Sequence, residues 1–165
     1  MENDVWSGGC QCGAVRFHLL SPPGDAYLCH CRMCQKQMAG PFAAWVDMPR
    51  EAFRISRGAL SYFQSSDTAK RGFCAACGTP LTFEFLQGPQ VTVAIGAFDR
   101  HAEITPRMHY GIEAREAWTS DLDRLPAEET GEGAGAQFYT TEKLDSIQQS
   151  SRQHPDHDTD RWPAD

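Results

Sequence analysis

The seven cysteines are the residues whose spacing points most directly to chemistry. They form three clusters: Cys10-Gln11-Cys12, Cys29-His30-Cys31-Arg32-Met33-Cys34 and Cys74-Ala75-Ala76-Cys77. Cysteines that serve as small core hydrophobes are scattered along the chain, and an odd number cannot be fully paired as disulfides. Zinc favours four thiolate or imidazole ligands in a tetrahedron. The clustering therefore predicts that this protein binds zinc.

Glycines flank two of the clusters. Gly8, Gly9 and Gly13 surround the first cluster, and Gly78 follows the third. Glycine permits the positive φ angles of a tight turn. Such turns can direct backbone N–H groups at the sulfurs, which favours the thiolate form and holds its geometry.

Seven ligands divide into a set of four and a set of three. The first and third clusters would close a structural site, made by Cys10, Cys12, Cys74 and Cys77. The second cluster would bind another zinc and leave one coordination position open, as in reactive sites. Its ligands would be Cys29, Cys31 and Cys34. Two alternatives stay open. A single zinc could bind beside three bystander thiols, or the second site could be closed by a histidine: His18, His30 or His109.

Three thiolates would also limit the reactions available at the second site. They donate much negative charge, so a zinc ion there is a weaker Lewis acid than one held by three histidines. Such a site suits a soft ligand, above all an incoming thiolate. The chemistry favours thiol binding or thiol alkylation over hydrolysis.

The elements that must position these cysteines are mainly short strands. Alternation and turn residues predict strands over 14–19, 41–47, 80–86 and 90–98, and a hairpin of 53–56 with 60–64 around Gly58. One short helix is predicted over 32–39, ended by Gly40, and a helical turn over 114–118. The expected fold class is mainly β, with small antiparallel sheets and one or two short helices.

The chain of 165 residues fits one domain with a tail. A zinc-binding domain is expected over residues 1–126. A polar tail is expected over 127–165, with one weakly docked helix over 141–149. The net charge of −7 argues against nucleic acid or an anionic membrane surface as partner. No apolar run reaches the about 20 residues of a membrane span, and no export signal is evident, so a cytoplasmic protein with reduced thiols is expected.

The order of three motifs resembles a known family. The motifs are Gly9 to Phe17, Cys29 to Lys36 and Arg71 to Leu81, with a looser match around His109 and Trp118. Together they are similar to the glutathione-dependent formaldehyde-activating enzymes and the related centromere protein V group. The resemblance covers about residues 6 to 126. It implies a β-tent fold stapled by two zinc ions, with the same division of cysteines into a structural and a catalytic set.

The resemblance also implies a reaction. The family is named for joining formaldehyde to glutathione as S-hydroxymethylglutathione, a carbon–sulfur lyase activity. The thiol would take the open position, lose its proton and attack the aldehyde carbon. Four cationic residues beside the cysteine clusters are candidates for binding the anionic glutathione: Arg32, Lys36, Lys70 and Arg71. The competing interpretations are a zinc-stabilised binding module without turnover and a redox-sensing zinc switch, in which thiol oxidation releases the metal.

Overall fold

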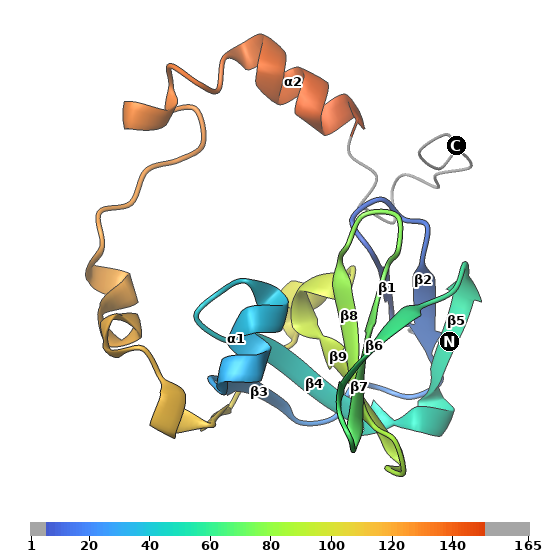
Figure 1. Ribbon diagram of the computed structural model, residues 1–165. Coiled ribbons are helices and arrows are strands. Elements are labelled where there is room, and N and C mark those ends of the chain that lie inside the picture. The colour runs from blue at the N-terminus through green and yellow to red at the C-terminus, as the bar shows by residue number, and fades with distance from the viewer. Residues whose placement is uncertain (1–5, 151–165) are drawn as a thin grey trace.

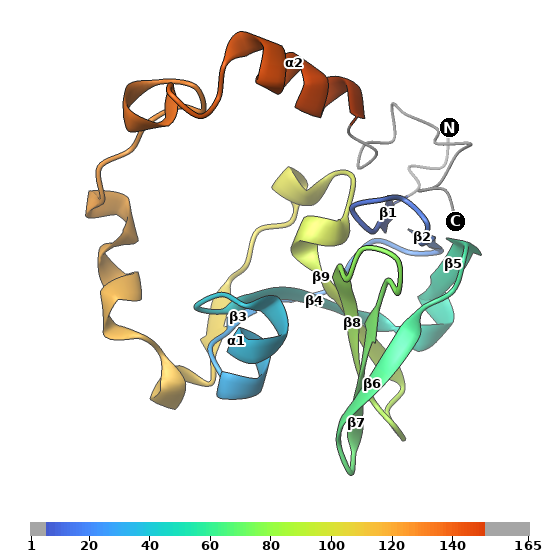
Figure 2. The same cartoon turned by 45° about the horizontal axis from the view of Figure 1, so that its top comes forward.

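The computed structural model describes residues 6–150 and consists mainly of β-strands (Figures 1 and 2). Within this range, ten strands form two sheets, accompanied by two α-helices and several short 3₁₀ helices. The mainly β fold with few helices is confirmed. No helix among the described residues is long and apolar enough to cross a membrane.

The smaller sheet has three strands in the order β1-β2-β5. Its strands are β1 (Ser7–Gly9), β2 (Arg16–Leu19) and β5 (Phe53–Arg57), and both pairings are antiparallel. Gly8 and Gly9 lie in β1 without positive φ, unlike Gly13 and Gly78 at φ 76°. A Cβ on Gly8 would lie 2.2 Å from the carbonyl oxygen of Ala97, so close packing explains that glycine.

The larger sheet has seven strands in the order β10-β3-β4-β9-β8-β7-β6. Its strands are β3 (Ala26–Cys29), β4 (Ala43–Pro49), β6 (Ser61–Ser66), β7 (Ala69–Phe73), β8 (Pro80–Phe85), β9 (Gln90–Ala94) and β10 (Met108–Tyr110). All pairings are antiparallel except β10 with β3, which is parallel. The core contains the buried side chains of Phe17, Trp45, Met48, Leu81 and Val93.

The predicted hairpin between 53–56 and 60–64 is wrong. β5 pairs with β2 in the smaller sheet, whereas β6 pairs with β7 in the larger one. Gly58 has the positive φ of a turn, but a Cβ there would lie 2.1 Å from the carbonyl oxygen of Ala14. The turn therefore packs against the loop of the first cysteine cluster and carries the chain from one sheet to the other.

The helices lie close to their predicted positions. α1 spans Arg32–Met38, and Ala39 rather than Gly40 adopts the left-handed conformation at its end, while the Gly40 N–H bonds to the carbonyl of Gln35. Short 3₁₀ helices at Ile112–Ala114 and Ala117–Arg124 replace the predicted turn over 114–118. α2 spans Thr141–Ser150. The domain boundary at residue 126 stays a prediction, and the end of the predicted tail, 151–165, lies outside the described residues.

Candidate metal centres

The first and third cysteine clusters meet where two loops converge. Cys10 and Cys12 lie in the loop from β1 to β2, and Cys74 and Cys77 in the loop from β7 to β8. All four sulfurs lie within 4.8 Å of one another. The Sγ atoms of Cys10 and Cys12 are 3.5 Å apart, and those of Cys12 and Cys74 are 3.8 Å apart. A tetrahedron with zinc–sulfur bonds of about 2.3 Å has edges of about 3.8 Å, so the geometry fits zinc.

The two loops fold in the same way. The N–H of Cys10 bonds to the carbonyl of Val15, and the N–H of Cys74 bonds to the carbonyl of Thr79, five residues along the chain in both cases. A positive-φ glycine, Gly13 or Gly78, directly follows the second cysteine of each pair. This is the glycine-dependent turn that the sequence predicts.

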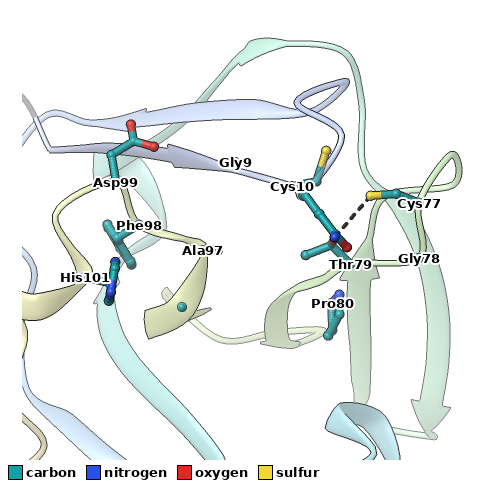
Figure 3. Close-up of a pocket in the computed structure, with 12 residues that line it drawn as sticks. Gly9, Cys10, Cys77, Gly78, Thr79, Pro80, Ala97, Phe98, Asp99 and His101 are labelled. Atoms are coloured by element: carbon teal, nitrogen blue, oxygen red, sulfur yellow. Dashed lines mark hydrogen bonds between the residues drawn. The ribbon is translucent and has the colours of Figure 1, made fainter. Parts of the chain in front are cut away.

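Hydrogen bonds favour the thiolate of Cys77. Burial opposes its ionisation, but hydrogen bonds from the side chain and backbone of Thr79, together with those from Cys12, outweigh burial and lower the pKa of Cys77 to about 6. Figure 3 shows the Thr79 hydroxyl beside the Cys77 sulfur, at 3.1 Å. Because the same oxygen accepts the N–H of Gln11, its proton is free to point at Cys77. Burial, by contrast, raises the pKa of Cys10 to about 12, against the bond from the N–H of Val15.

We expect Thr79→Val to weaken metal binding at the four-cysteine site by about 10- to 100-fold. Valine keeps the shape of threonine but removes the hydroxyl that bonds to Cys77 and to the N–H of Gln11. Competition with a chromophoric chelator measures the loss. Thr79→Ser, which keeps the hydroxyl, is the control and should retain most of the affinity; equal losses in both variants would contradict the assignment.

The second cysteine cluster forms a separate group of three sulfurs. Cys29 ends β3, Cys31 precedes α1 and Cys34 lies in its first turn. The three Sγ atoms lie within 4.8 Å of one another, and no fourth histidine, cysteine or carboxylate of residues 6–150 joins them. Cys29 and Cys34 are buried, whereas Cys31 is half-buried. Three converging sulfurs without a fourth protein donor fit a metal ion with one position open to an outside ligand.

Positive charge and hydrogen-bond donors surround Cys34. A hydrogen bond from Cys29 lowers the pKa of Cys34 to about 5 despite burial, and the indole of Trp45 and the guanidinium of Arg71 contribute in the same direction. That hydrogen bond raises the pKa of Cys29 in turn. Both terminal nitrogens of the buried Arg71 lie 3.8 Å from the Cys34 sulfur. The group is therefore built to hold thiolate at Cys34.

Within residues 6–150, no histidine joins either sulfur group. His30 lies between two cysteines in sequence, but its Nε2 is 2.8 Å from Nδ1 of His109, and its ring faces Phe42. Burial, His109 and Arg115 together lower the pKa of His30. His18 lies on β2 of the other sheet. Among the described residues, the alternative of a histidine-closed second site thus finds no support.

The four predicted thiol-binding cations separate into two groups. Arg32 and Lys36 are exposed on α1 and, together with Arg71, line a cavity of about 470 Å³ next to that helix. Lys70 faces the other way, because neighbouring residues of a strand point to opposite faces. Its ammonium group is 3.4 Å from the buried carboxylate of Glu84, to which Arg50 is also paired. The structure thus brings Arg71, and not Lys70, to the sulfurs.

Replacing Arg71 with methionine is expected to weaken metal binding at the three-cysteine group by about 10- to 100-fold. The variant keeps a long apolar stem over Phe83 but removes the charge beside Cys34. Competition with a chelator measures this loss, as a lower affinity for the metal ion that the protein releases more readily. Lys36→Met, which removes an exposed charge from the adjacent helix, should leave that affinity unchanged; a loss of the same size there would show a general charge effect instead.

Sequence reasoning missed several polar residues around the sulfurs. Thr79 and Gln37 are two of them; Gln37 accepts a hydrogen bond from Arg71 and orients it. The side chain of Gln35, which is buried, donates a hydrogen bond to the carbonyl of Ala114 at 2.9 Å. This bond holds the 3₁₀ helix Ile112–Ala114 beside α1. The only available signal was their position within or next to a cysteine cluster.

Fold and sites together define a class: small β proteins with one four-cysteine and one three-cysteine group that could each hold a metal ion. Residues 5–114 match the family described as glutathione-dependent formaldehyde-activating enzyme. Because this match covers most of the chain, the protein belongs to that family, and the predicted resemblance is confirmed.

Known relatives agree with this membership. A Halomonas elongata protein provisionally named as a glutathione-dependent formaldehyde-activating enzyme is 29% identical over 122 residues, which cover 67% of this chain and 77% of the relative. An uncharacterized lyase of Schizosaccharomyces pombe is 29% identical over 83 residues, 50% of this chain, and the match spans 60% of that relative's length. A Rhodobacter sphaeroides crystal structure matches with a TM-score of 0.50 and 26% identity, over 63% of this chain and 98% of that one.

Proposed function

We propose that this protein is a zinc-dependent carbon–sulfur lyase that promotes the addition of glutathione, or a similar thiol, to formaldehyde or a related small aldehyde. The observation that carries the proposal is the group of Cys29, Cys31 and Cys34, whose sulfurs converge without a fourth protein donor among the described residues. Family membership and the relatives' names support the same chemistry. We place the protein in the cytoplasm, where the seven free cysteines would stay reduced.

The two sulfur groups would have different roles. A structural zinc would be held by the four-cysteine site, which ties the β1–β2 loop to the β7–β8 loop. A second zinc, held by the three-cysteine group, would supply a cation that favours the thiolate form of an incoming thiol. The hydrogen bond from Cys29 and, to a smaller extent, those from Trp45 and Arg71 favour the thiolate of Cys34, which would help the chain retain that cation.

The reaction itself needs no oxidant or reductant. The thiol sulfur bonds to the aldehyde carbon, the carbon–oxygen double bond becomes a single bond, and the thiol proton ends on the oxygen. Arg32 and Lys36, both exposed on α1 next to the group, are placed to attract the carboxylates of glutathione. The chain's contribution is thus to concentrate and deprotonate the thiol.

NMR exchange spectroscopy with ¹³C-formaldehyde and glutathione tests the proposal. It compares the rate of adduct formation in the presence of the protein with the spontaneous rate. We expect the zinc-loaded protein to accelerate formation well above that background, and to do so less at high salt, where attraction by Arg32 and Lys36 is screened. A zinc-loaded protein that leaves the rate at background would favour the binding module instead.

A further inference from the structure

The chain after the last strand forms a long arm that packs little against the body. We use "arm" for residues 117–150, which contain the 3₁₀ helix Ala117–Arg124 and α2. Both views show it leaving the strands beside α1 and curving around them at a distance (Figures 1 and 2). Thr119 is its only buried residue, so the arm lacks a core of its own.

The arm nevertheless exposes large apolar side chains. Phe138 is 61% exposed and Trp118 53% exposed, and Leu122, Leu125, Tyr139 and Ile147 are exposed as well. Trp118 and Leu122 lie in the 3₁₀ helix Ala117–Arg124, on either side of its break at Asp121, and Leu125 directly follows this helix. A surface with this many exposed apolar groups is typical of a segment that binds another surface.

A groove on the body has matching properties. It is the 470 Å³ cavity between α1 and β6, and its lining is mostly apolar, with Met33, Phe63, Phe73 and Pro80. Met33 and Phe63 are themselves more than half exposed. β6 is an edge strand of the larger sheet, so the groove is open on that side.

The charges of arm and body are complementary. Residues 6–110 carry ten lysines and arginines against seven acidic residues, a net charge of +3. The arm, residues 117–150, carries seven acidic residues against two basic ones, a net charge of −5. Two exposed cations of the body, Arg32 and Lys36, line the groove, whereas Arg71 is buried there and already bonded to Gln37 and Cys34. Because the same two cations are proposed to attract glutathione, a docked arm would compete with the thiol. Such complementary charge steers association and fixes its orientation.

We infer that the arm of one copy docks in the groove between α1 and β6 of a second copy, giving a symmetric dimer by exchange of arms. The direction in which the arm leaves α1 favours docking on a second copy over docking in the groove of the same chain. Ala114 is tied to Gln35, and Trp118 lies near the end of α1 with Ala39 and Pro41. From there both views show the arm running away from β6 and β7.

Photo-crosslinking of the full-length chain tests this inference. p-Benzoylphenylalanine replaces Phe138, and ¹⁵N-labelled and unlabelled copies of this variant are mixed, allowed to exchange and irradiated. We expect crosslinked peptides from 138 to the segments around Met33 or Phe63, with one labelled and one unlabelled member in statistical proportion. Crosslinks only between peptides with the same label would show docking within one chain and overturn the dimer.

Light scattering after size exclusion gives an independent readout. The native chain should elute as a dimer, and the double variant Phe138→Ser/Tyr139→Ser should raise the dissociation constant about tenfold or more. Lys36→Glu should weaken the dimer, because it reverses a charge that lines the groove. Phe85→Ser, which removes an exposed phenylalanine of β8 outside the groove, is the matched control and should stay dimeric. A monomeric native chain, or a dimer indifferent to the changes at 138 and 139, would refute the proposal.

Discussion

Cys74→Ala is expected to unfold the domain, although it removes only one sulfur atom. The four-cysteine site joins the loop between β1 and β2 of the smaller sheet to the loop between β7 and β8 of the larger one. Binding energy at a structural zinc site is folding energy, of about 10–16 kcal/mol in small zinc domains. That is as large as the roughly 5–15 kcal/mol by which a typical whole domain is stable, since the two ranges overlap. Without the ion, the domain should not hold its two sheets together.

Circular dichroism and thermal melting, with zinc measured by mass spectrometry, would show this loss. Cys74→Ala should give no cooperative transition and bind less than one zinc per chain. Ala75→Ser, an exposed neighbour in the same loop, is the matched control and should melt like the native protein. A Cys74→Ala protein that keeps its metal or melts within a few degrees of the native one would contradict the structural role.

The ligand clusters could be predicted from sequence because the constraint on them is local. Residues such as Cys74 and Cys77 are already near each other along the chain. The glycine after each pair indicates a tight turn with a positive φ angle. Pairing of the clusters across the fold needed only the count of seven and the preference of zinc for four ligands. The structure then brings the first and third clusters together as that count suggested.

Strand partners could not be predicted in the same way. The turn at Gly58 is visible in the sequence, but a turn shows only that the chain changes direction and not which strand it meets. β5 and β6 therefore looked like a hairpin, although each pairs with a strand in a different sheet. Pairing is decided by burial across the whole domain. β10, for example, pairs in parallel with β3, although the paired residues lie 81 positions apart in the chain.

The sequence also left open which face of its strand each side chain occupies. Lys70 and Arg71 are neighbours with the same charge, and nothing in the sequence distinguishes them as candidates for the site. Because β7 was not predicted, neither was the face to which each side chain points. In the structure Arg71 lies opposite Phe83 and reaches Cys34, whereas Lys70 lies opposite Glu84 and pairs with it. A shift of one residue along β7 would exchange these roles.

Cys31→Ala is expected to have the opposite outcome to Cys74→Ala, namely a folded protein without activity. Cys31 is half-buried at the start of α1, and the three-cysteine group draws its ligands from one short stretch instead of from two sheets. Two remaining sulfurs are too few to retain zinc at physiological concentration. The variant should therefore bind one zinc per chain where the native protein binds two, melt close to the native temperature, and form the thiol–aldehyde adduct only at the spontaneous rate.

Native mass spectrometry counts the metal ions, and exchange spectroscopy on the same sample measures the rate. Met33→Ala, an exposed residue between Cys31 and Cys34 that offers no thiolate, is the matched control and should keep two zinc ions and full activity. Retention of two zinc ions by Cys31→Ala would show that this sulfur is not a ligand. Loss of one zinc ion with an unchanged rate would place catalysis elsewhere and leave the second ion as a structural one. The two cysteine variants act on metal sites with separate ligands. If Cys74→Ala loses the fold while Cys31→Ala loses only activity, the second site is catalytic; if both lose the fold, it is a second structural site.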